Sequence, residues 1–336
     1  MKETATSSAR ELLDRPAWPA QRVAVWAAFV AVLVLTPFLV TTGYYLTLAT
    51  NALITMILAL SLNFTIGRIG LFSLSHAAFL GVGGYTAAIL AQRYGVSPWA
   101  TLPLAMSASM LIAGLIGVPV LRLRGFFLAV ATLSFTLFAE VFARQASDIT
   151  GGAYGITGIP ALTFFGIPLR GIWMYEVALC VLLLTALLFE NIRLSRFGRA
   201  IIASRDNETA AAAAGIDITR TRLAGYVLSA AITGAAGWTY AFFHLTLNPY
   251  VLSLDITFLW LFIVLIGGLG SMRGAALASI VLVVGPELLG FAASVQVLTA
   301  GVLVLLVVLL FPRALGGMVE DIEQYLFKRK PAGGNG

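Results

Sequence analysis

The chain has 336 residues, of which 60% are hydrophobic and 11% are charged, and its formal net charge is +6. An ordinary soluble domain carries about 25% charged residues, so this composition excludes a soluble globular fold. The basic residues are scattered between apolar runs, which argues against nucleic-acid binding, and Cys180 is the only cysteine, which excludes a disulfide framework.

The apolar runs have the length of transmembrane helices. A bilayer core of about 30 Å needs about 20 apolar residues per helix. We therefore predict an all-α, polytopic integral membrane protein with about ten transmembrane helices, or eight at the lower limit. A membrane domain over 23–311 is expected between a retained polar segment at 1–22 and a tail at 312–336. The predicted helices lie near residues 23–42, 45–66, 71–92, 99–121, 126–143, 172–190, 223–243, 255–270, 275–291 and 294–311.

The positions of Lys and Arg predict the orientation, because cytoplasmic loops hold an excess of them. If both termini are cytoplasmic, the outer side receives only Arg93, Arg144 and Arg170, and the other Lys and Arg residues fall inside. We therefore expect a multi-pass protein of the cell inner membrane. Its longest outer loop covers 144–171 and its longest cytoplasmic loop covers 191–222.

The stretch from Gly70 to Leu90 is unusually polar and glycine-rich for membrane depth, and it could either cross or re-enter. Polar groups at that depth tend to face the bundle interior and mark pathways, although Ser, Gly and Ala are also ordinary helix-contact residues. His76 is favoured over His244, which lies near a helix end. The candidate substrate-pathway residues are Asn63, Ser73, Ser75, His76, Tyr85 and Thr86.

Small residues recur every four positions in the predicted helix 223–243. This spacing places them on one helix face, and a contact stripe between helices is favoured over substrate contact. The stripe consists of Gly225, Ser229, Thr233 and Gly237. A second glycine-rich turn, at 267–270, precedes Arg273 on the predicted inner side.

The cytoplasmic loop contains a short helix signal. Asp206 or Asn207 can cap a helix that Ala210 to Ala214 would continue, and Gly215 suits the left-handed position that ends it. About two helical turns are not stable alone in water. We therefore expect this helix to dock, either on its own transmembrane helix ends or in a groove of a cytoplasmic partner.

Several activities are disfavoured by missing residues. The only lysines are Lys2, Lys328 and Lys330, and glycine precedes none of them, so a GxxxxGK[ST] phosphate loop cannot occur. No carboxylate lies clearly at mid-depth, and Glu140 is spaced to pair with Arg144. Ion-driven carriers usually need buried carboxylates, so an autonomous carrier or channel is a weaker alternative. No catalytic triad or metal-ligand cluster stands out, and we expect no enzyme activity.

Three segments resemble a known family. They are SLNFTIGRIGLFSLSHAAFLGVGGYTAAIL from Ser61, TGGAYGITGIP from Thr150 and FGRAIIASRDNETAAAAAGI from Phe197. Together they resemble the LivM-like permease subunits of ATP-driven branched-chain amino acid importers, over roughly residues 45 to 310. The resemblance implies an ABC importer permease fold in the membrane lipid. It also implies as partners a second homologous permease, two cytoplasmic ATPase subunits and an outer substrate-binding protein. This chain itself would bind no cofactor, because the partner subunits use the ATP.

The resemblance also implies an EAA-x3-G coupling element in the cytoplasmic loop. Aligning on Gly215 places Thr209, Ala210 and Ala211 at the EAA positions, with Glu208 one place early. The implied substrates are branched-chain, hydrophobic amino acids; urea, short amides or aromatic acids are alternatives within the same importer class. The implied ATPase-coupling residues are Arg205, Asp206, Glu208, Thr209, Ala210, Ala211 and Gly215.

Overall fold

The computed structural model describes residues 42–123 and 125–288, with single positions at 31, 33, 34, 36, 37, 301, 302 and 305. The predicted helices at 23–42 and 294–311 lie almost entirely outside these residues, as do the predicted domain boundaries near 22 and 312. The chain divides into two units, Met1–Leu46 and Thr47–Gly336, and the features below belong to the second.

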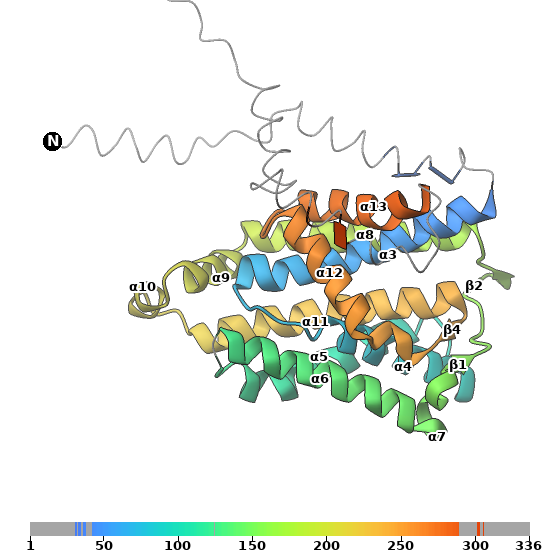
Figure 1. Cartoon of the computed structure of the whole chain (residues 1–336), viewed down its shortest axis with the longest axis horizontal. Helices are drawn as coiled ribbons and strands as arrows, with labels where there is room; N and C mark the ends of the chain where they lie inside the picture. Colours follow the sequence, from blue (N-terminus) through green and yellow to red (C-terminus); the bar gives the residue numbers. More distant parts are fainter. Residues whose placement is uncertain are drawn as a thin grey trace, which may run out of the picture. The chain divides into compact units, whose positions relative to one another are not determined.

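Helices dominate the described residues, and short strand pairs occur only in their loops (Figure 1). Strand β1 pairs with β4 and strand β2 with β3, both antiparallel. The longer helices are α3 (Gly43–Asn63), α4 (His76–Arg93), α5 (Thr101–Val120), α6 (Phe126–Gln145), α8 (Ile172–Leu194), α11 (Ile218–His244), α12 (Leu254–Gly267) and α13 (Met272–Leu288). The shorter elements are η1 (Phe64–Ile69), α7 (Ser147–Thr150), η2 (Gly152–Tyr154), β1 (Ile156–Thr157), β2 (Thr163–Phe164), β3 (Ile167–Pro168), α9 (Arg196–Asp206), α10 (Glu208–Ala213), β4 (Thr246–Leu247) and η3 (Pro249–Leu252).

The helical positions confirm the predicted all-α membrane fold. Among the described residues, four helical segments are long and apolar enough to cross a membrane: Gly43–Ile69, α5, α6 and α8. Helix α12 is apolar but shorter. Helices α11, α12 and α13 fall where the sequence predicts spans at 223–243, 255–270 and 275–291.

The predicted helix at 71–92 begins later than expected. Residues 70–75 are not helical, and α4 begins only at His76. Gly70 adopts a left-handed φ of 79°, which ends the π-helix η1. The Leu74 backbone then bonds outside its own segment: its N–H donates to Thr132 Oγ1 at 3.0 Å, and its carbonyl accepts from Thr136 Oγ1 at 2.8 Å. These α6 hydroxyls replace the bonds that a helix would have supplied.

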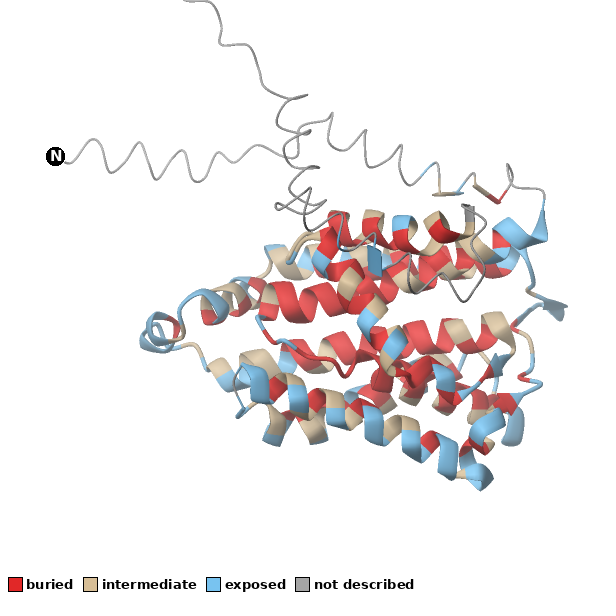
Figure 2. Cartoon of the chain, viewed as in Figure 1, coloured by how far each residue is buried: buried red, intermediate tan, exposed pale blue. Residues whose placement is uncertain are grey.

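Helix α11 packs closely against α4 and α5 at the centre of this unit. A Cβ atom on Gly83 of α4 would overlap the backbone of Gly234, and one on Gly237 would overlap the Leu80 carbonyl. Small residues thus allow the backbones to touch. Gly237 belongs to the predicted stripe of small residues, whereas Gly234 lies outside it. Figure 2 shows α11 mostly buried, whereas α5 and α6 carry many exposed positions.

The exposed faces of α5 and α6 are apolar. Leu111 of α5 and Phe138 of α6 each expose 65% of their surface, and other large apolar side chains lie beside them on the same helices. A soluble protein rarely leaves so much contiguous apolar surface in water. These faces therefore suit contact with lipid or with another membrane-embedded chain.

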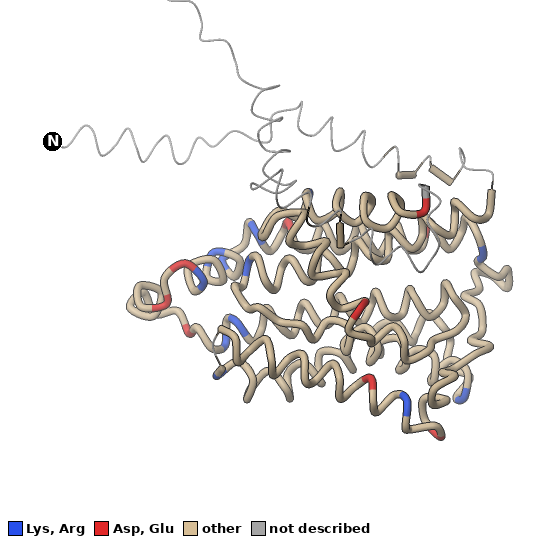
Figure 3. The backbone as a smooth tube through the Cα atoms, viewed as in Figure 1, with Lys and Arg blue, Asp and Glu red and all other residues tan. Residues whose placement is uncertain are grey.

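Basic residues gather at one end of the helices (Figure 3). We call this the Arg-rich end: it comprises α9, α10, the last turn of α8 and the first turns of α11. Arg93 and Arg144 lie in the last turns of α4 and α6, and the Arg93 guanidinium donates to the carbonyl of Asp148 in α7. The two groups of basic residues are separated as the positive-inside rule predicts.

Candidate functional site

The loop at the Arg-rich end forms two short helices with local caps. Ser195 Oγ accepts from the Gly198 N–H at 3.1 Å to begin α9, and Asn207 Oδ1 accepts from the Ala210 N–H at 3.0 Å to begin α10. Asn207, rather than Asp206, is therefore the cap of the second helix. Gly215 follows with a φ of 82°, the left-handed conformation that the sequence predicts there.

Helix α10 leaves most of its small side chains exposed. It packs on α9 and the beginning of α11, and within it only Ala211 is buried. Thr209 and Ala210 are exposed, and so is Gly215 after it. A helix of this length gains little stability by itself, so the bare alanine face is suited to docking on another chain.

Ion pairs hold the ends of this loop. Arg205 pairs with Asp206 at 2.8 Å, and Glu208 pairs with Arg222 of α11 at 2.8 Å. Arg222 also donates to the Ser204 carbonyl at 2.9 Å. Pairs this exposed stabilise a protein by at most about 1 kcal/mol, so their effect is mainly to fix the position of α10 against α11.

Arg205 also connects the loop to the π-helix η1. Its Nη1 donates to the Gly67 carbonyl, and the stem of its side chain lies against Gly70, where a Cβ atom would approach Arg205 Cγ to 2.6 Å. Glycine at position 70 is therefore required both by its positive φ and by the arginine beside it. Arg205, predicted as a coupling residue, thus contacts the membrane part of the protein directly.

Asn63 holds the turn between α12 and α13. Its Nδ2 donates to the carbonyls of Gly268 and Ser271 at 3.1 and 2.9 Å, and its Oδ1 accepts from the Gly270 N–H at 2.6 Å. The side chain is buried, and Gly270 packs directly against Gly67. The structure therefore shows Asn63, a predicted pathway residue, bound to a neighbouring turn.

His76 belongs to a buried network of hydroxyl groups. Its Nε2 lies 2.9 Å from Ser229 Oγ and 3.3 Å from Thr65 Oγ1, and these two hydroxyls are 2.6 Å apart. Ser61 Oγ extends the network to Thr233 Oγ1 at 3.0 Å and to the Ser229 carbonyl at 2.8 Å. We call these five residues the hydroxyl network; it joins α3, η1, α4 and α11.

The other predicted pathway residues lie on both sides of His76. Ser75 Oγ is 2.6 Å from the Tyr226 hydroxyl and 2.8 Å from Ser73 Oγ, and both serines are buried. Tyr85 and Thr86 lie more than two turns further along α4. The Tyr85 hydroxyl is buried and has no hydrogen-bond partner among the described residues. The structure thus gathers Ser73, Ser75 and His76 around α11 and leaves Tyr85 and Thr86 apart.

A cavity of about 580 Å³ lies among α3, α4, α11, η3, α12 and α13. Sequence analysis did not predict this chamber, although Asn51 and Thr55 stand one turn apart within apolar α3 and are a signal for it. Pockets for small ligands typically measure about 300–1,000 Å³ and combine apolar walls with a few polar groups. The polar side chains that line the chamber are Asn51, Thr55, Tyr240, Tyr250, Asp255 and Glu287.

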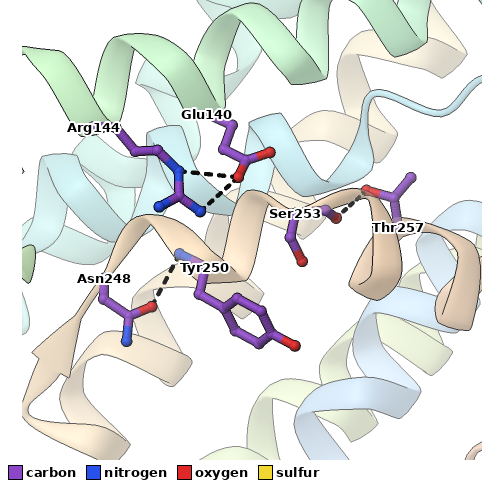
Figure 4. A network of polar contacts seen from close by, with 6 residues as sticks. All are labelled: Glu140, Arg144, Asn248, Tyr250, Ser253 and Thr257. Carbon is purple, nitrogen blue, oxygen red and sulfur yellow. Dashed lines mark hydrogen bonds and ion pairs between the residues drawn. The ribbon is translucent and has the colours of Figure 1, made fainter. Parts of the chain in front are cut away.

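The turn around η3, which contributes Tyr250 to the chamber lining, is held by polar contacts (Figure 4). Asn248 Oδ1 accepts from the Tyr250 N–H at 3.0 Å, and Thr257 Oγ1 donates to the Ser253 carbonyl at 3.0 Å. On α6, Glu140 and Arg144 form the predicted ion pair, with 2.8 Å between the carboxylate and the guanidinium. Figure 4 shows the Tyr250 ring extending away from that ion pair.

Comparisons with known proteins agree with one another. The family described as "Branched-chain amino acid transport system / permease component" matches residues 44–312. The "High-affinity branched-chain amino acid transport system permease protein LivM" of Salmonella typhimurium is 33% identical over 312 residues, covering 86% of this chain and 73% of the relative. The protein of that name from Escherichia coli is 33% identical over 313 residues, covering 85% and 73%.

A more distant relative matches as well. The "Probable branched-chain amino acid transport permease protein LivH" of Methanocaldococcus jannaschii is 25% identical over 247 residues, covering 70% of this chain and 77% of the relative. No solved structure matches.

Proposed function

The chain belongs to the family of permease components of branched-chain amino acid transport systems, and we propose that it imports hydrophobic, branched-chain amino acids as the permease subunit of an ATP-driven importer. The observation that carries this function is the family match, which runs over residues 44–312 and so includes α10, the hydroxyl network and the chamber. The apolar, small-residue interior is consistent with a route for aliphatic side chains.

The energy for import comes from other subunits in this proposal. The chain lacks a GxxxxGK[ST] phosphate loop, so separate cytoplasmic ATPase subunits bind and hydrolyse the ATP. The relatives include proteins named LivM and LivH, which supports a pair of different permease chains. An outer binding protein then delivers the amino acid. This chain itself performs no reaction and binds no cofactor.

Helix α10 is the proposed contact for an ATPase subunit. Its exposed alanine face permits close approach, and the Asn207 side chain caps its first turn locally. The Arg-rich end is then cytoplasmic in the inner membrane, with both termini on that side, because the positive-inside rule assigns basic ends to the cytoplasm. Motion of the ATPase subunits would reach the membrane helices through α9 and Arg205.

The test is leucine uptake into vesicles that contain this chain with its partner permease, ATPases and binding protein. One variant replaces residues 210–215 with a Gly-Ser segment of equal length, and a matched control replaces the exposed outer hairpin 163–168 in the same way. We expect the first variant to insert normally but to lose ATPase association and ATP-dependent uptake. The control should still bind the ATPase subunits.

Two results would contradict this proposal. One is uptake of leucine by this chain alone without ATP, which would favour the alternative of an autonomous carrier. The other is normal uptake by the 210–215 variant, which would remove α10 from the coupling contact. Competition by valine and isoleucine, but not by urea or short amides, would assign the substrate class.

A further inference from the structure

We infer that the chamber is an amino-acid binding site on the transport route, in which Asp255 takes the ammonium group and the apolar walls take the aliphatic side chain. This inference rests on the proposed function and deepens it, because it places the substrate at named residues. None of these residues was predicted from sequence as part of the pathway.

Several polar side chains of the chamber have donors or acceptors that no described residue occupies, so they are available to a ligand. Asp255 lies in the first turn of α12, and among the described residues its carboxylate makes no hydrogen bond or ion pair. The hydroxyls of Thr55 and Tyr240 likewise have no hydrogen-bond partner within the described part of the chain. Asn51 Oδ1 lies 3.0 Å from His244 Nε2, which leaves the Asn51 amide group available as a donor.

These groups match the two charged ends of an amino acid. A carboxylate with no protein partner favours a cation, and an α-ammonium group offers three donors to it. The Asn51 amide and the tyrosine hydroxyls are neutral donors that suit a carboxylate. Neutral donors hold an anion less strongly than an arginine would, and a transport route needs a site that also releases its ligand.

The rest of the chamber wall is apolar and large enough for a branched side chain. Ile54, Leu58 and Leu80 line it from α3 and α4, and Leu259 and Leu282 line it from α12 and α13. Burying an aliphatic side chain against such walls is favourable and requires no directional bond. The site would therefore accept leucine, isoleucine and valine alike.

The chamber ends where the hydroxyl network begins. Leu58 and Ser61 are three residues apart on α3, and His76 and Leu80 are four apart on α4, so each pair shares a helix face. The apolar floor thus lies one turn from the buried hydroxyls of Ser61 and His76. Asp255, by contrast, is exposed near the opposite rim. The ligand would enter past Asp255 and stop at this floor.

The experiment measures thiol labelling of the chamber wall in the full complex. Cys180, the only cysteine, is changed to serine, and Leu48→Cys or Ile256→Cys introduces a thiol on either of two walls. A water-soluble maleimide labels the thiol with and without leucine, in the absence of the binding protein. Ser97→Cys, exposed in the turn between α4 and α5 and not lining the chamber, is the matched control.

Leucine should slow labelling at both wall positions and leave labelling of Ser97→Cys unchanged. Isoamylamine, which keeps the ammonium group, should also protect, whereas 4-methylpentanoate, which keeps only the carboxylate, should not. Asp255→Asn should raise the half-protecting leucine concentration about tenfold, the loss expected for one charge-assisted hydrogen bond. Asp148→Asn, an exposed carboxylate of α7 that does not line the chamber, should have no effect.

The inference fails if leucine protects neither wall position, or if Asp255→Asn and Asp148→Asn behave alike. That failure is separate from a failure of the proposed function, which leucine uptake by the same complex measures. Uptake without protection would remove the chamber and keep the importer. Protection in a complex that imports no amino acid would keep the binding site and overturn the importer.

Discussion

Asn63 offers a stringent test of the contacts between α3 and the turn that joins α12 to α13. Its side chain makes three hydrogen bonds to the α12–α13 turn and is 1% exposed. Asn63→Ala would remove all three bonds. The Gly270 N–H would lose its acceptor, whereas the Gly268 and Ser271 carbonyls would keep the bonds that they accept from the backbone N–H groups of Ser271 and Ala275. At about 0.5–1.5 kcal/mol for each net hydrogen bond, the loss should be about 2–4 kcal/mol in the free energy of unfolding.

The measurement is the free energy of unfolding in mixed detergent micelles, with Asn248→Ala as the matched control. Asn248 makes a single bond, to the Tyr250 N–H, in an exposed turn, so its loss should cost about 1 kcal/mol or less. Asn63→Asp should destabilise at least as much as Asn63→Ala, because a carboxylate would face the Gly268 and Ser271 carbonyls. Equal losses for Asn63→Ala and Asn248→Ala would refute the reasoning.

Three further substitutions test other contacts. Arg205→Ala should retain most ATPase activity of the complex but import less leucine per ATP hydrolysed, and equal stoichiometry to the parent would contradict this. Gly83→Ala should destabilise the chain because its Cβ overlaps α11, whereas Gly114→Ala, whose Cβ meets only one atom at 4.0 Å, should be neutral or stabilising by up to about 1 kcal/mol in thermal unfolding. Glu208→Gln breaks the partly exposed pair with Arg222 and should cost at most about 1 kcal/mol, with uptake retained at half or more of the parent rate.

The membrane helices follow from sequence because their signal is local. Twenty consecutive apolar residues satisfy a bilayer wherever they occur, so hydropathy alone places α5, α6 and α8. The non-helical segment 70–75 does not follow in this way. The hydrogen bonds of the Leu74 backbone are made with Thr132 and Thr136, about 60 residues away, and no local sequence pattern predicts them.

The same distinction between local and distant contacts applies to the candidate site. The caps of α10 depend on neighbours within four residues, so Asn207 and Gly215 can be read from sequence. In the sequence, Asn63 looks like any other polar residue in a membrane helix. Its hydrogen-bond partners lie more than 200 residues away, so its role in holding a turn could not be predicted. The chamber depends on six separate elements, so Asn51 and Thr55 can indicate a polar position in α3, but only the packing of all six elements shows the cavity.

The contacts at the Arg-rich end limit how α10 can move. Arg205 binds the Gly67 carbonyl, Gly67 touches Gly270, and Asn63 ties that same turn to α3. These are short backbone contacts with no flexible side chain between Gly67 and Gly270, so they cannot stretch. If the proposed ATPase contact moves α9, either the Arg205 bond must break or the α12–α13 turn must follow. Because α12 and α13 line the chamber, the second outcome would change the site where we place the amino acid.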